Sequence, residues 1–113
     1  MGKVYNDMYS SERVKTMNIT SYTVEYIKDP TGILTGDRYE FFLDIDVDED
    51  DELYSENGIK LRVLYYKNEE DERILNYHFA ESLTGKVLDF ALDEEEEKTV
   101  SAFCRENLSQ TQD

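Results

Sequence analysis

The sequence has few of the residues from which disulfides, metal sites and catalytic centres are built. It contains one cysteine, one histidine, one proline and no tryptophan. A single cysteine, Cys104, excludes an internal disulfide and fits a reducing compartment, so we expect a cytoplasmic protein. No stretch approaches the roughly 18 apolar residues of a membrane span, and the N-terminus has no apolar signal segment.

Basic residues are also scarce. The chain has 12 Lys and Arg against 27 Asp and Glu, a formal net charge of -15. Such a surface repels phosphate groups, which argues against binding to nucleic acids or to anionic membranes. One hypothesis is therefore that the protein imitates a nucleic-acid backbone and inhibits a basic protein.

The usual catalytic motifs are missing. With one histidine, every Ser–His–Asp arrangement would have to use His78, and there is no G-x-S-x-G elbow or phosphate-binding glycine loop. His78 and Cys104 fall in different predicted elements, with no spacing typical of zinc ligands. We expect a protein that is not an enzyme and that needs no cofactor.

The residues that are present predict one small domain. Hydrophobic residues make up 39% of the 113 positions, which is sufficient for a single core. Period-two alternation, clearest over residues 38–47, indicates strands joined by short turns, and short turns favour antiparallel neighbours. Strands are predicted over residues 19–27, 38–47, 59–66, 73–80 and 86–92.

A helix is predicted to follow the strands. Asp93 and Glu96 have the spacing of a capping box, and Val100, Phe103 and Leu108 then recur at helical intervals. The fold class is therefore α+β: an antiparallel meander of about five strands with one C-terminal helix packed on one face. Cys104 lies on the helix stripe and is expected to be a core residue. The predicted core also contains Tyr39, Phe41, Leu43, Ile45, Leu61, Val63, Leu75, Tyr77, Phe79, Leu88, Phe90, Val100, Phe103 and Leu108.

The domain is predicted to span residues 17–108. Residues 1–16 do not share its pattern and form either a flexible arm or a non-native extension before a start at Met17. Residues 109–113 are expected to be a disordered tail.

The outward side of the predicted sheet is not uniformly polar. Apolar and aromatic side chains interrupt it among charged ones, which is typical of a surface for a protein partner or for self-association. The alternative is that the arm of residues 1–16, the acidic connection of residues 48–58 or a second layer covers these side chains. The candidate partner-binding residues are Phe42, Leu64, Tyr66, Ile74 and His78. The leading function is a non-enzymatic protein-binding or regulatory module.

A weaker hypothesis is a divalent-cation-binding domain. Asp44, Asp46, Asp48 and Asp50 supply the oxygen ligands that hard cations prefer. Their spacing does not fit a helix-flanked calcium loop, and ion pairs with basic residues of the neighbouring strand explain the first two equally well.

The segments MNITSYTVEYIKDPTGILTGDRYEFFLDIDVDEDDELYSENGIKLRVLYY, NYHFAESLTGKVLDFALDEEE and VSAFCRENL together resemble a family of short acidic proteins of unknown function. Its members come from Bacillus-like Gram-positive bacteria, and some carry the label "pullulanase". The resemblance covers residues 17–108 and implies a bacterial cytoplasmic protein, with a glycan-related role as a further alternative. It brings no catalytic or ligand residues, and the sequence holds no glycosidase motif.

Overall fold

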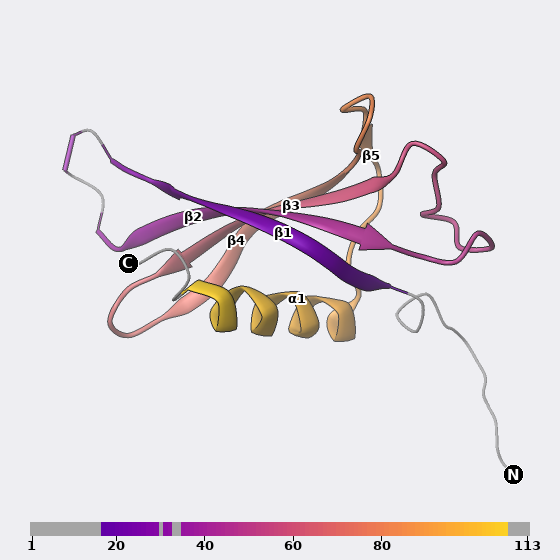
Figure 1. The fold of residues 1–113 in the computed structure, drawn as a ribbon. Coiled ribbons are helices and arrows are strands. Elements are labelled where there is room, and N and C mark those ends of the chain that lie inside the picture. Colours follow the sequence, from indigo (N-terminus) through magenta and orange to yellow (C-terminus); the bar gives the residue numbers. More distant parts are fainter. Residues whose placement is uncertain (1–16, 30, 33–34, 109–113) are drawn as a thin grey trace, which may run out of the picture.

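The structure, a computed structural model, describes residues 17–29, 31–32 and 35–108. The predictions for residues 1–16 and 109–113 fall outside these residues. In the described part of the chain, a sheet is covered on one face by a single helix, while its other face has no second layer (Figure 1).

The sheet is an antiparallel meander, as predicted. Its strands lie side by side in the same order as in the chain. Each neighbouring pair is antiparallel, and the connections after β3 and β4 are far too short for the crossover that a parallel pair needs. The strands are β1 (Asn18–Ile27), β2 (Asp37–Asp46), β3 (Ile59–Lys67), β4 (Glu72–Glu81) and β5 (Val87–Leu88).

The core lies between the two central strands and the helix. Every second residue of β2 and β3 points to the helix side, and the register places Phe41 opposite Val63 and Leu43 opposite Leu61. These four side chains have no exposed surface. The other buried hydrophobic residues on this side are Tyr39, Ile45, Val47, Leu53, Ile59, Tyr65, Phe79, Val100, Cys104 and Leu108.

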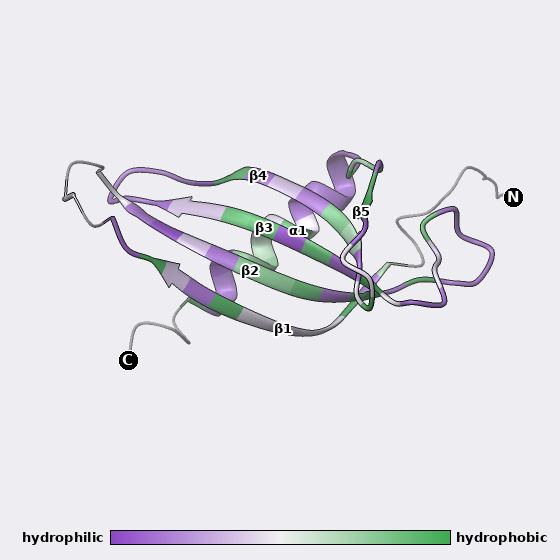
Figure 2. Ribbon diagram, turned by 90° about the horizontal axis from the view of Figure 1, so that it is seen from above, coloured by the Kyte–Doolittle hydropathy of each residue, from purple (hydrophilic) through white to green (hydrophobic). Residues whose placement is uncertain are grey.

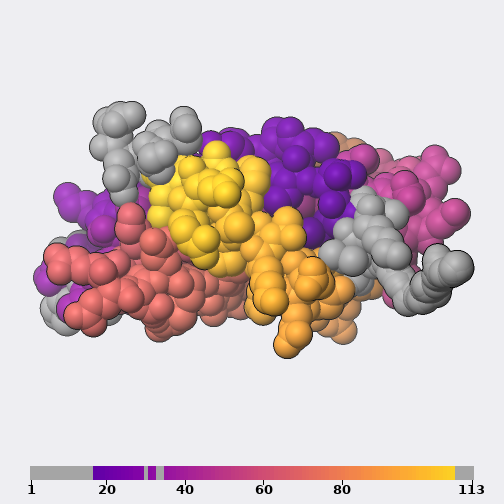
Figure 3. Space-filling view, turned by 90° about the horizontal axis from the view of Figure 1, so that it is seen from below, coloured from indigo at the N-terminus to yellow at the C-terminus, as the bar shows by residue number. Residues whose placement is uncertain are grey.

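The helix α1 (Glu94–Asn107) begins with the predicted capping box. The Asp93 carboxylate accepts a hydrogen bond from the backbone N–H of Glu96 at 2.8 Å, and the Glu96 carboxylate accepts one from the N–H of Asp93 at 3.0 Å. These bonds satisfy amides that the first turn leaves unpaired. The predicted stripe of Val100, Cys104 and Leu108 is buried against the sheet. Seen from the helix side, α1 runs between β1 and β4 (Figure 3).

A bulge in β4 overturns two of the predicted orientations. Leu64 pairs with Asn76, but the next residue, Tyr65, pairs with Ile74, so Leu75 is an extra residue on β4. The extra residue reverses the alternation beyond it. Ile74 consequently packs on the core instead of facing outward, and Leu75 is 38% exposed instead of buried.

The last strand is shorter than predicted. β5 contains only Val87 and Leu88, because the backbone N–H of Phe90 donates to the carbonyl of Leu88 at 3.0 Å and turns the chain away from β4. The apolar residues of the predicted strand still contact the core from the connection to α1, with Leu88, Phe90 and Leu92 partly buried against it.

Two side chains of the acidic connection between β2 and β3, Val47 and Leu53, are buried in the core. Leu53 is 1% exposed and belongs to the core, whereas Tyr54 is 40% exposed. Ser55 and Asn57, farther along the same connection, donate hydrogen bonds to the carboxylate of Glu81 at 3.0 and 3.3 Å. With Thr84, which donates at 2.7 Å and has the largest effect, they lower the pKa of Glu81. This carboxylate thereby joins the connection to the turn after β4.

Candidate functional site

The outer face of the sheet is the side that α1 does not cover. Figure 2 views this side, with the four long strands in front of the helix. It is built from the residues that alternate with the core residues, and the register sets Phe42 opposite Arg62, Glu40 opposite Leu64 and Arg62 opposite His78. We call this surface the open face.

The charges of the open face balance. It carries four acidic residues from β1 and β2, and four basic residues from β2, β3 and β4, in a chain whose net charge is -15. Neighbouring strands pair many of them: Lys60 Nζ lies 3.7 Å from Asp44 Oδ1, and Arg62 Nε bonds the carboxylate of Glu40. Each exposed pair stabilises the fold by at most about 1 kcal/mol, so their main effect is to neutralise this surface. The acidic residues are Glu25, Glu40, Asp44 and Asp46, and the basic ones are Arg38, Lys60, Arg62 and Arg73.

The apolar and aromatic side chains of the open face include three that are half-buried near its centre. Phe42 lies under Arg62, whose guanidinium carbon is 5.4 Å from the centre of the ring. Leu64 and His78 border a shallow hollow of about 220 Å³, which is also lined by Glu40, Arg62, Asn76 and Tyr77. Flat, mixed surfaces of this kind are common in protein interfaces.

Tyr66 is on the same face but does not project from it. The guanidinium carbons of Arg38 and Arg73 lie 5.1 and 5.0 Å from the centre of its ring, and Asn68 donates to its hydroxyl at 2.8 Å. Gly36 packs against the ring so closely that a Cβ there would lie 2.6 Å from it. Tyr66 is therefore only 8% exposed, and it supports the face instead of offering a contact.

The structure thus brings four of the five predicted partner-binding residues to one face. Phe42, Leu64 and His78 are accessible there, and Tyr66 is buried among arginines. Ile74 is excluded because the β4 bulge turns it to the core side. Sequence reasoning missed the arginines that flank Tyr66, although the pairing of residues 38 and 66 follows from the register of β2 and β3.

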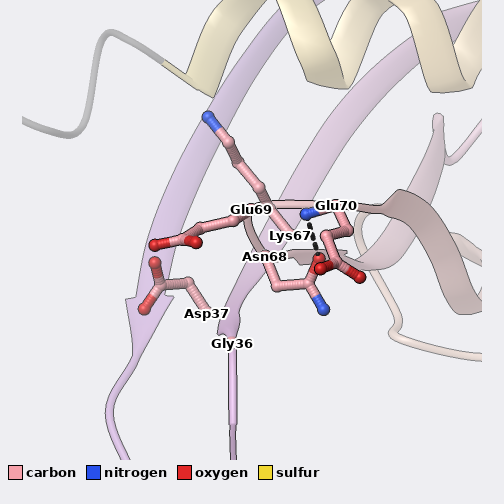
Figure 4. A pocket seen from close by; sticks show the side chains of 6 residues that line it. All are labelled: Gly36, Asp37, Lys67, Asn68, Glu69 and Glu70. Atoms are coloured by element: carbon pink, nitrogen blue, oxygen red, sulfur yellow. Dashed lines mark hydrogen bonds between the residues drawn. The ribbon is translucent and has the colours of Figure 1, made fainter.

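A different, larger hollow lies at the end of the sheet near the β3–β4 turn. It has a volume of about 690 Å³ and is lined by two carboxylates of the turn, Glu69 and Glu70, together with Gly36, Asp37, Lys67 and Asn68 (Figure 4). The Asn68 side chain accepts hydrogen bonds from the backbone N–H groups of Glu70 and Asp71 at 2.7 and 2.6 Å, which accounts for its position. Its described lining has no His, Cys or Ser, and its acidic groups are those of an ordinary polar turn.

The four aspartates of the cation hypothesis do not form a cluster. Within residues 17–29, 31–32 and 35–108, no group of three or more His, Cys, Asp or Glu side chains is placed to hold a metal ion. Asp44 instead accepts a hydrogen bond from Ser21 and pairs with Lys60.

The only histidine and the only cysteine are on opposite sides of the sheet. His78 is on the open face, and Cys104 of α1 is fully buried between the helix and the sheet. Burial raises the pKa of the Cys104 thiol to about 12, so it stays protonated and unreactive near neutral pH.

The sequence from Met17 onward matches a model of a protein family. The model is that of the family of unknown function DUF6509, and it matches residues 17–111. The chain belongs to this family. No curated protein and no solved structure matches the chain. A DUF6509 family assignment agrees with the resemblance seen in the sequence, while the expected bacterial source stays a prediction.

The described part of this DUF6509 chain also has no helix long and apolar enough to cross a membrane. Its location in the cell stays a prediction.

Proposed function

We propose that the protein is a non-enzymatic protein-binding module whose partner docks on the open face. The observation that carries this proposal is the electrical neutrality of this face in a chain of net charge -15. Solubility alone does not require one surface to be neutral while acidic residues elsewhere stay unbalanced. A neutral face with Phe42, Leu64 and His78 partly exposed is suited to a partner surface that is also mixed and not strongly basic.

The chemistry of the chain supports a binding role over a catalytic one. The thiol of Cys104 is buried, and His78 has no cysteine on its side of the sheet. Arg62, which stacks on Phe42, is bonded to Glu40, and this raises the pKa of its guanidinium further. Stacked arginine and aromatic groups are frequent among residues that dominate binding energies.

The test uses a variant that removes the apolar groups while keeping the face neutral. In Phe42→Asp combined with Leu64→Lys, the new carboxylate lies opposite Arg62 and the new ammonium opposite Glu40. The fold is therefore retained, and binding of proteins captured by the wild-type chain should fall at least about tenfold.

The matched control places one aromatic-to-Asp and one Leu-to-Lys substitution outside the open face. Tyr54→Asp with Leu83→Lys changes side chains that are 40% and 79% exposed, in the connection between β2 and β3 and in the turn after β4. We expect this control to bind as the wild type does. If both double variants bind equally well, the open face is not the docking surface. Release of the captured protein by moderate salt alone would instead support the nucleic-acid-mimic hypothesis.

A further inference from the structure

Among the residues that the structure describes, strand β1 is a long edge of the sheet. Its ten residues pair with β2 on one side and with no described strand on the other. After an irregularity between Ile19 and Ser21, the pairing continues without interruption from Ser21 to Ile27. The backbone N–H and C=O groups on the other side of this stretch can therefore accept a further strand.

The opposite edge of the sheet is protected in ways that β1 is not. β5 has only two residues, and β4 beyond it carries the bulge at Leu75 and the charged residues Glu72 and Arg73. Short strands, bulges and charges are the features that prevent edges from pairing. One available edge permits a closed pair of molecules but not a chain of them.

The charge of β1 suits a second copy of itself. Only Glu25 is charged among its ten residues, whereas β2 has five charged residues. A basic peptide would find one carboxylate to pair with on this strand. A strand with little charge that is rich in aromatic and β-branched residues suits it better, and β1 itself is such a strand.

The helix side of β1 is only partly covered. Tyr22 packs edge-on against Phe103 of α1 with the ring centres 5.2 Å apart, and Val24 is partly buried, but Tyr26 is 52% exposed. Figure 3 shows that part of β1 stays in view at the side of α1. A strand added along β1 would cover the remaining apolar surface of this row.

We propose that two copies of the chain pair through antiparallel β1 strands, about a two-fold axis normal to the sheet near Val24. In this register Tyr22 faces the partner's Tyr26, and Glu25 faces the partner's Thr23. Side chains on the helix side of one copy then lie beside side chains on the helix side of the other. Across the junction, no carboxylate lies directly opposite another. The open faces of both copies then lie on one side of a continuous sheet. This pairing does not depend on what the open face binds.

The experiment measures the mass of the full chain in solution together with amide exchange. Sedimentation should give twice the 13.3 kDa of one chain as concentration rises. Hydrogen exchange should slow in β1 over the same concentration range, because amides that face away from β2 become hydrogen-bonded. A single-chain mass at every concentration overturns the proposal, and so does a dimer in which β1 exchange is unchanged.

Three variants at one position test the register. Thr23→Glu places a carboxylate opposite the partner's Glu25 on both sides of the two-fold axis. We expect this repulsion to raise the dissociation constant of the dimer by about tenfold. Thr23→Gln, which has the same size without charge, should dimerise as the wild type does, and Thr23→Lys should dimerise at least as tightly. The neighbour of Thr23 within the molecule is Phe42, so none of these changes opposes a like charge on β2. Equal dimerisation of the Glu and Lys variants contradicts this register.

Discussion

Tyr66 shows how a residue on the outer face of a sheet becomes buried without a second layer above it. Its ring is held between two guanidinium groups and against Gly36, whose φ of +77° is in the left-handed region that favours glycine. A methyl group at this position would meet the ring at 2.6 Å, and the arginines on its faces leave the ring little room to move.

We expect Gly36→Ala to lower the free energy of unfolding by about 3 kcal/mol, because it adds this clash to backbone strain. Gly85→Ala is the matched control: Gly85 has the same φ, but a Cβ there would have no atom within 4 Å. It should cost about 1 kcal/mol, from strain alone. Chemical denaturation of both variants measures the difference. Equal losses would contradict a close contact between Gly36 and Tyr66.

At the scale of elements, the sequence predicts the regular strands and misses the irregular one. In β2, the apolar residues Tyr39, Phe41, Leu43 and Ile45 recur at every second position, and of the residues between them only Phe42 is apolar, so the period of two is clear. In β4, Ile74 and Leu75 are adjacent apolar residues, and their order carries no information about which one faces the core. Only the pairing with β3 decides this, since Tyr65 lies opposite Ile74. The sequence also predicts the capping box of α1, because both partners lie within one turn.

The bulge predicts which of two substitutions in β4 destabilises the fold more, and regular alternation predicts the opposite order. Ile74→Ala should destabilise the fold by about 2 kcal/mol, because it removes a side chain packed on the core. Leu75→Ala should cost less than about 1 kcal/mol, since its side chain is 38% exposed. Thermal or urea unfolding of the two variants checks this order. A larger loss from Leu75→Ala would mean that β4 has no bulge at this place.

For the candidate site, alternation correctly predicts that Phe42, Leu64 and His78 share a face. The sequence does not predict the burial of Tyr66, which depends on arginines brought from β2 and β4. The charge balance of the face also depends on which residues lie side by side. Composition records only the total of -15.

At the scale of the whole molecule, that total has a measurable effect on stability. Unbalanced carboxylates repel one another more strongly in the folded chain than in the extended one, and salt screens this repulsion. We expect sodium chloride to raise the midpoint of thermal unfolding by about 5 °C between low and near-physiological ionic strength. Magnesium or calcium chloride at matched ionic strength should have the same effect, because the described residues hold no cluster of metal ligands. A clearly larger rise with one divalent ion would show specific binding, and thermal melts at several salt concentrations distinguish the two results.

The uneven charge of the molecule also influences how it meets other macromolecules before any contact forms. Another acidic protein that approaches the helix side or the acidic connection between β2 and β3 is repelled, while one that approaches the open face meets four positive and four negative groups. Within about a Debye length, roughly 8 Å at physiological salt, this difference in repulsion makes some orientations of approach more frequent than others. The surface charge thereby favours encounters of another acidic protein with the open face over encounters with the more acidic sides.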